Sequence, residues 1–206
     1  MLKELVRTPS IQSPYVTEEE FVSQRDEDIK AEWVDGEVIV AAAATTKHVL
    51  LVTFLHRTFG FFVEVKGLGV AYGPELEIRL GKLRRRRVPD LLFVAADRLE
   101  IVKESHVEGA PDLIVEIVSQ DSVARDWRDK YMEYEAAGVQ EYWVIDPLSK
   151  RVEAYKLGKN GQFTRILEKQ KTIYSAVLPG FYLKPEWLWQ PQLPNPLDIL
   201  KEWGVI

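Results

Sequence analysis

Residues 111–118 read Pro-Asp-Leu-Ile-Val-Glu-Ile-Val, a segment in which the acid Glu116 stands between apolar neighbours. Residues 88–94, Val-Pro-Asp-Leu-Leu-Phe-Val, place Asp90 in a similar setting. Nearly continuous apolar runs are typical of strands that are buried on both faces, in the middle of a sheet covered by helices. An ionised carboxylate inside such a strand is costly unless it is paired or binds a cation. Two such acids on two similar strands therefore need a common explanation.

Local signals predict further elements on either side of these two strands. On the N-terminal side we expect a helix that begins at the capping box of Thr17 and Glu20, a hairpin of strands 31–34 and 37–40 around Asp35-Gly36, a core helix from Thr46 to Gly67, and a strand at 75–80. On the C-terminal side we expect a helix from Asp121 or Ser122 to Ala137, a strand at 140–146, and a hairpin of strands 151–155 and 162–167. The core order is helix, strand, strand, strand, helix, strand. This order predicts an α/β (α+β) fold, a mixed sheet flanked by helices.

Chain length and composition indicate one domain. The 206 residues fit a single domain over 1–206, and 46% of them are hydrophobic. Residues 177–206 contain five of the eleven prolines together with Trp187, Trp189 and Trp203. This C-terminal extension is too aromatic for a free linker. We expect it to pack on the core or on a partner subunit, which would make a homodimer.

Composition excludes several classes of protein. No apolar run approaches the ~20 residues of a membrane span, and the first residues lead into no signal peptide, so we expect a cytoplasmic protein without a membrane partner. The absence of cysteine excludes disulfides and thiolate metal sites. Any metal must therefore bind through oxygen or imidazole. A formal net charge of -5 disfavours broad nonspecific binding to nucleic acid.

The two strand acids suggest a site for a hard metal ion. Mg²⁺ prefers oxygen ligands and is typically held by one or two carboxylates plus waters and phosphates. The alternative explanation is a pair of ordinary acids at strand ends. Lys130 lies four residues after Asp126 and four before Tyr134, so these three side chains share a helix face. Taken alone, this pattern would indicate a surface ion pair of little energetic value.

Several motifs taken together resemble the Uma2 family. They are Trp33-Val34-Asp35-Gly36-Glu37, His48, residues 89–94, residues 109–119, and Lys130-x3-Tyr134-x3-Gly138-Val139-x-Glu141-Tyr142-Trp143. Any one of these fragments is a weak motif, but their order and spacing are specific. The resemblance covers residues 17–157. It implies an endonuclease of the PD-(D/E)XK, or restriction-endonuclease-like, superfamily, with a restriction-endonuclease-like core.

The resemblance also implies roles for individual residues. Asp90 and Glu116 match the metal-binding acids of the PD and E-x-K motifs, with Mg²⁺ or Mn²⁺ as the cofactor. The E-x-K lysine is absent because Val118 stands at its position. A helix lysine replaces it in the Uma2 pattern, and Lys130 matches that residue, which makes it the expected catalytic lysine. Glu37 matches an acid that follows Asp-Gly in the family. It could be a further metal ligand or a hydrogen-bond acceptor for a residue that binds the metal, and the alternative is an ordinary hairpin residue. The residues expected to surround these groups are His48, Ser119, Asp126 and Tyr134. For His48 the alternative is a packing or helix-capping role.

A basic run lies directly before Asp90 in the sequence. Its cations are Lys82, Arg84, Arg85, Arg86 and Arg87. They would contact DNA phosphates on either side of the scissile one. Binding of this kind depends on salt concentration and not on base sequence. The alternatives are a solvated turn or a cluster that neutralises acids such as those at 18–20.

These features lead to one main hypothesis and two alternatives. The main hypothesis is a Mg²⁺-dependent endonuclease that hydrolyses phosphodiester bonds of DNA. The first alternative is a catalytically silent nucleic-acid-binding or scaffold protein that keeps the nuclease fold. The second is a metal-dependent phosphoesterase that acts on RNA or nucleotides.

Overall fold

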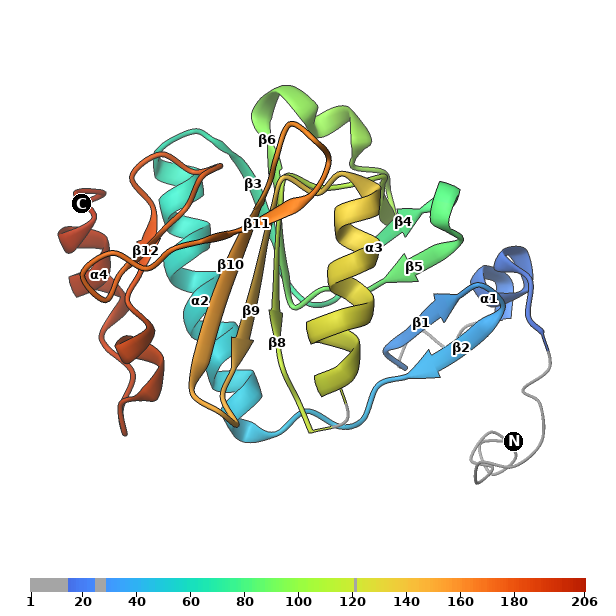
Figure 1. The fold of residues 1–206 in the computed structure, drawn as a ribbon, viewed down its shortest axis with the longest axis horizontal. Coiled ribbons are helices and arrows are strands. Elements are labelled where there is room, and N and C mark those ends of the chain that lie inside the picture. The colour runs from blue at the N-terminus through green and yellow to red at the C-terminus, as the bar shows by residue number, and fades with distance from the viewer. Residues whose placement is uncertain (1–14, 25–28, 121) are drawn as a thin grey trace.

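A six-stranded mixed sheet forms the centre of the molecule (Figure 1). The computed structural model describes residues 15–24, 29–120 and 122–206, so Asp121, one expected helix start, lies outside the described residues. The strand order is β11-β10-β9-β8-β6-β3, in which β8 runs parallel to β9 and antiparallel to β6. The mixed sheet predicted from the sequence is thereby confirmed. The strands are β3 (Gly69–Tyr72), β6 (Leu91–Ala95), β8 (Leu113–Ile117), β9 (Glu141–Asp146), β10 (Arg151–Leu157) and β11 (Phe163–Ile166).

Helices cover both faces of this sheet (Figure 1). On one face, α2 (Thr46–Val65) buries Leu55, Phe59 and Phe62 against residues of β6, β8 and β9. On the other face, α3 (Lys130–Ala137) follows a π-helical turn, Arg125–Asp129, and buries Tyr134. Every residue of β8 is buried, as the continuous apolar run predicts for a central strand.

A second, five-stranded sheet lies beside α3, with the order β2-β1-β5-β4-β7. The strand expected at 75–80 is not part of the core, because β4 belongs to this smaller sheet and β3 lies beside β6 instead. The arginine run also differs from expectation, because 85–87 is the strand β5 between β1 and β4. The elements of this part are α1 (Glu18–Gln24), β1 (Ala31–Val34), β2 (Glu37–Val40), β4 (Glu77–Leu80), the 3-10 helix Gly81–Leu83, β5 (Arg85–Arg87), the 3-10 helix Ala96–Ile101 and β7 (His106–Glu108).

Local signals at two N-terminal positions are confirmed. The Thr17 backbone N–H donates to the Glu20 carboxylate at 2.9 Å, and the Glu20 N–H donates to the Thr17 hydroxyl at 3.2 Å, which is the predicted capping box. Between β1 and β2, Asp35 and Gly36 have φ angles of 47° and 94°. Positive φ at both central residues is what a two-residue hairpin turn of this kind requires.

The C-terminal extension packs on this chain's own core, beside α2 (Figure 1). The ring of Trp203 lies 5.6 Å from that of Phe62, and Phe181 lies 5.1 Å from Phe59, measured between ring centroids. Trp187 belongs to the same buried cluster. The elements of the extension are β13 (Tyr182–Leu183), the 3-10 helix Pro185–Trp189 and α4 (Pro196–Glu202). The strand β12 (Ile173–Tyr174) lies just before the extension and pairs with β13.

By length and composition alone, α2 could cross a membrane, contrary to the expectation that no segment of the chain could. Core helices of water-soluble proteins pass the same test. Here one side of α2 packs against the central sheet and α4, while Val49, Leu50 and Phe61 are exposed.

Candidate functional site

The pairing of β6 with β8 brings Asp90 and Glu116 together. Leu91 pairs with Val115, so Asp90, directly before β6, lies beside Glu116 on β8. Side chains alternate along a strand, which sends both acids to the face that α3 covers. The Ile117 N–H donates to the Asp90 carboxylate at 2.8 Å, and the two acids are only 4% and 2% exposed. The two acids predicted from the sequence therefore meet in the interior.

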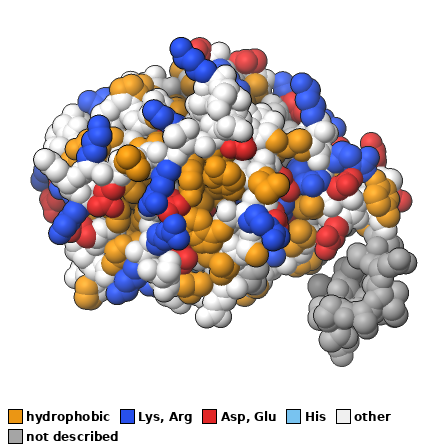
Figure 2. Space-filling model, in the orientation of Figure 1, with side chains coloured by type: hydrophobic (Ala, Val, Ile, Leu, Met, Phe, Trp, Pro, Cys, Tyr) orange, Lys and Arg blue, Asp and Glu red, His pale blue; other side chains and the backbone are white. Residues whose placement is uncertain are grey.

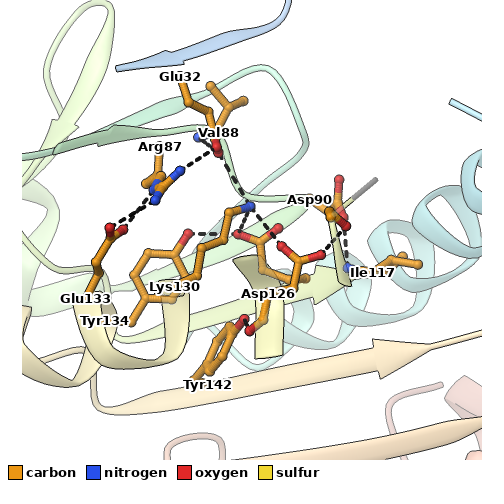
Figure 3. Close-up of polar contacts among 12 residues, drawn as sticks. Glu32, Arg87, Val88, Asp90, Ile117, Asp126, Lys130, Glu133, Tyr134 and Tyr142 are labelled. Atoms are coloured by element: carbon orange, nitrogen blue, oxygen red, sulfur yellow. Dashed lines mark hydrogen bonds and ion pairs between the residues drawn. The ribbon is translucent and has the colours of Figure 1, made fainter. Parts of the chain in front are cut away.

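Lys130 reaches the same place from α3 (Figure 3). Its ammonium nitrogen lies 3.0 Å from Glu116 Oε1, 3.2 Å from Asp126 Oδ1 and 3.4 Å from Glu32 Oε1. Tyr134, one turn further along, donates its hydroxyl to Glu116 Oε1 at 2.7 Å. Lys130 is 6% exposed, which excludes the surface ion pair considered as the alternative.

Asp126 and Lys130 stand on either side of the transition from π-helix to α-helix. The Lys130 N–H donates to the Arg125 carbonyl, a bond that spans five residues. Such π-helical turns are rare and often occur at functional sites. Ser122 donates its hydroxyl to Asp126, and Ser119 donates to the Ser122 hydroxyl at 2.9 Å. Ser122 thus links the predicted residue Ser119 to Asp126, which contacts Lys130 directly.

Glu32 is a site residue that the sequence analysis missed. It lies on β1, is 6% exposed, and accepts hydrogen bonds from Arg87 at 2.8 Å and from the Val88 N–H at 3.1 Å. Glu37, the acid expected from the family pattern, lies exposed at the start of β2 and does not line the cavity described below. The criterion that singled out Asp90, an acid inside an apolar strand, applies equally to Glu32 and would have found it.

A histidine and a lysine contact the Asp90 carboxylate. His48 Nε2 lies 3.2 Å from Asp90 Oδ1, and the ammonium nitrogen of Lys30 lies 3.4 Å from the same oxygen. The predicted proximity of His48 to the site is therefore present in the structure. Its backbone N–H also donates to the Thr45 hydroxyl that caps α2. Lys30, which precedes β1, carried no sequence signal.

Burial and neighbouring charge oppose one another in this cluster. Burial raises the pKa of Glu116, as do the neighbouring acids, and the Lys130 charge only partly offsets this. Burial alone would lower the pKa of Lys130, but the surrounding carboxylates raise it overall, so its ammonium stays charged. Burial would raise the pKa of Asp90, yet the His48 hydrogen bond and the Lys30 charge lower it overall. Asp90 is consequently the ionised acid of the pair at neutral pH.

A cavity of about 350 Å³ adjoins this cluster. Asp90 and Glu116 both line it, together with the Ala41–Ala44 segment, Thr45 and His48 near the N-terminus of α2, and Ser119, Gln120, Ser122 and Arg125. Among the residues that the structure describes, no group of three or more acids or histidines is arranged to hold a metal. Two carboxylates beside an open space nevertheless suit a hard ion that keeps several waters. Asp90 and Glu116 are the residues that fit this role.

The arginine run is used within the protein. Arg85 pairs with Glu133 at 2.7 Å, Arg87 pairs with both Glu133 and Glu32, and Arg86 pairs with Glu18 and Glu77. These pairs form because β5 lies inside the smaller sheet, where a buried guanidinium must be compensated. The structure thus favours the alternative of acid neutralisation for 85–87. The two exposed cations of the run are Lys82 and Arg84, and Arg84 pairs with Asp35 at 2.5 Å.

Comparison with known proteins shows the family of this chain and a similar fold. A family model named Uma2 and described as "Putative restriction endonuclease" matches residues 18–186. The chain belongs to the Uma2 family. Its fold is similar to a solved structure from Anabaena variabilis ATCC 29413, titled a "putative nuclease belonging to DUF820", with a TM-score of 0.70 and 19% identity over 84% of this chain and 97% of that one. No curated protein matches.

Position 118 departs from the superfamily motif in the structure as well as in the sequence. Val118 is 1% exposed and packs in the apolar cluster that contains Tyr134. The charged nitrogen beside Glu116 comes from Lys130 instead. In this Uma2 protein the helix thus supplies a lysine where the strand supplies none.

Proposed function

We propose that this protein is an endonuclease that hydrolyses phosphodiester bonds of DNA with Mg²⁺ or Mn²⁺. One observation carries the proposal: the Lys130 ammonium lies 3.0 Å from Glu116, beside a cavity that Asp90 also lines. Membership of the Uma2 family supports a nuclease.

Asp90 and Glu116 would hold the metal ion. When bound, such an ion polarises a phosphate oxygen and lowers the pKa of a bound water. The Ile117 N–H and the Tyr134 hydroxyl each hold one of the two carboxylates in place. Because both carboxylates are fixed in this way, little reorganisation is needed when substrate arrives.

Lys130 would act on the water or on the phosphate. Its ammonium has three donors on a flexible stem, so it can orient the attacking water and stabilise negative charge that develops on phosphorus oxygens. Glu32 and Asp126 hold that ammonium next to Glu116. They are positioning residues, because in the structure they contact Lys130.

The test is cleavage of supercoiled plasmid at low salt with Mg²⁺, Mn²⁺ or EDTA. Asp90→Asn and Lys130→Met should each lower the metal-dependent rate by about 100-fold or more, the usual cost of losing one group that stabilises transition-state charge. Loss in Asp90→Asn alone would leave a nuclease without a catalytic role for Lys130. Absence of cleavage with every metal would contradict the proposal and favour the silent binding protein.

Glu32 and Glu37 make a matched pair in the same assay. Glu32→Gln removes a buried acid that contacts Lys130, so cleavage should fall. Glu37→Gln changes an exposed acid on the same hairpin, and cleavage should stay at the wild-type level. Equal activity of the two variants would contradict the positioning role of Glu32. Cytoplasmic location and a homodimer stay predictions, and sedimentation of the full chain checks the second.

A further inference from the structure

The engagement of the arginines at 85–87 raises the question of which cations could hold a DNA backbone. We infer that Lys47 and Lys150, here called the lysine rim, bind backbone phosphates of DNA at the mouth of the cavity. The inference rests on the proposed nuclease function, since it places the same substrate against the same cavity. It replaces the basic run at 82–87 as the contact surface.

Lys47 lies at the N-terminus of α2, next to the cavity. Its neighbours Thr45 and His48 line the cavity, while Lys47 itself is exposed. Its ammonium nitrogen donates to the Pro147 carbonyl at 3.3 Å. This contact joins the start of α2 to the turn between β9 and β10, although the two segments are a hundred residues apart in the sequence.

Lys150 is carried by that turn. The buried carboxylate of Asp146 accepts hydrogen bonds from the Leu148 and Ser149 N–H groups at 2.8 and 3.1 Å, and from the Ser149 hydroxyl at 2.8 Å. These bonds fix the turn, and Lys150 follows with a φ of 54° and an exposed side chain. Figure 1 shows the turn at the edge of the sheet where the chain enters α2 and leaves β8.

The lysine rim differs from other cations nearby in its charge balance. Arg151 pairs with Glu153, Arg128 pairs with Asp129, and Lys30 pairs with Asp90. Within the described part of the chain, neither Lys47 nor Lys150 forms an ion pair. Their charges are therefore available to a phosphate.

Such local charge matters because the protein as a whole is acidic. The net charge of -5 repels a polyanion at long range. Figure 2 shows basic and acidic side chains interspersed over the face in view, without a broad basic patch. A backbone contact must then come from a few cations close to the reacting phosphate. Lys47 has this position, since the residues beside it line the cavity. Lys150 follows three residues after Pro147, whose carbonyl Lys47 contacts.

The inference is tested by DNA binding without cleavage. The probe is a fluorescein-labelled duplex of about 20 base pairs in EDTA, titrated by anisotropy between roughly 50 and 200 mM salt. In the double variant Lys47→Gln/Lys150→Gln, affinity near 0.1 M salt should fall by about tenfold per lysine, and the salt slope should fall by about 0.9 per lysine. The control is Lys159→Gln, an exposed lysine in the turn between β10 and β11 that does not line the cavity, which should bind as wild type does.

Each other result overturns the inference in an identifiable way. If the double variant binds as wild type does while plasmid cleavage persists, the lysine rim is wrong and the nuclease stands. If Lys159→Gln loses as much affinity, the effect reflects overall charge and the rim is again wrong. If wild-type protein neither binds nor cleaves DNA, the proposed function and the rim both fail.

Discussion

The ammonium group of Lys130 lies 3.0 to 3.4 Å from carboxylates of three residues, Glu116, Asp126 and Glu32. These acids come from β8, from the π-helical turn and from β1. Taking several charges out of water is expensive unless each is compensated. One lysine therefore compensates acids from three elements, and its loss should affect the fold as well as any chemistry.

Replacing this lysine should destabilise the protein strongly. We expect Lys130→Met to lower the free energy of unfolding by about 3 to 5 kcal/mol at neutral pH, because the buried acids lose their partner. The deficit should grow as the pH rises above about 8, because Glu116, whose pKa is raised to about 8, then loses the proton that replaces the missing positive charge. Urea denaturation at two pH values measures both effects.

A matched lysine provides the control for this measurement. Lys201 on α4 has a side chain that is 66% exposed, and Lys201→Met should change stability by no more than about 0.5 kcal/mol. If Lys130→Met were as stable as Lys201→Met at every pH, the buried charge cluster described above would be contradicted.

At the scale of elements, α4 packs against α2. Trp203, at the end of α4, is 9% exposed and lies 5.0 Å from the Phe181 ring and 5.6 Å from the Phe62 ring. Aromatic pairs of this kind add to the energy of burying their area. The C-terminal extension is thus part of the main core.

Removing this anchor should cost about 3 to 5 kcal/mol of unfolding free energy in Trp203→Ala, the usual range for large-to-small changes in a core. Leu197→Ala on the same helix is the control, because Leu197 is 54% exposed and should contribute little. Thermal and urea unfolding of the two variants provide the comparison. Equal stability would show that α4 does not pack on α2 in solution.

At the scale of the whole molecule, ion pairs join the smaller sheet to α3. Arg87 on β5 pairs with Glu133 on α3, and Glu32 on β1 pairs with Lys130. Burial would raise the pKa of Glu32, but the charges of Lys130 and Arg87 and the Val88 hydrogen bond lower it to about 2. The attachment of the two parts should therefore depend on pH.

The sign of this dependence follows from linkage. A carboxyl with a lowered pKa in the folded state stabilises fully above its unfolded value, near 4.5, and loses that contribution as the pH falls toward 2. Ionisation of Glu32 should contribute about 3 kcal/mol above that range. We expect the difference in unfolding free energy between wild type and Glu32→Gln to fall by this amount across the interval. If the unfolding free energies of wild type and Glu32→Gln, measured by denaturation at each pH, changed in parallel, the lowered pKa of Glu32 would be contradicted.

Local patterns were sufficient for much of the fold and part of the site. The apolar runs around Asp90 and Glu116 predicted two central strands, and Thr17 with Glu20 predicted a helix start. Such signals lie within a few residues of each other, so the chain carries them without reference to the rest of the molecule. The family resemblance then related Lys130 to the two acids across the fold.

Other features depended on contacts between distant segments. Glu32 rather than Glu37 meets Lys130 because hairpin β1–β2 pairs with β5 and turns one of its faces toward α3. Arg87 became a buried strand residue because Glu32 and Glu133 compensate it there. The C-terminal extension packs on α2 of its own chain because its aromatic rings contact Phe59 and Phe62. Strand pairing and charge compensation join residues that are far apart in the sequence. No short segment of the sequence contains both residues of such a pair.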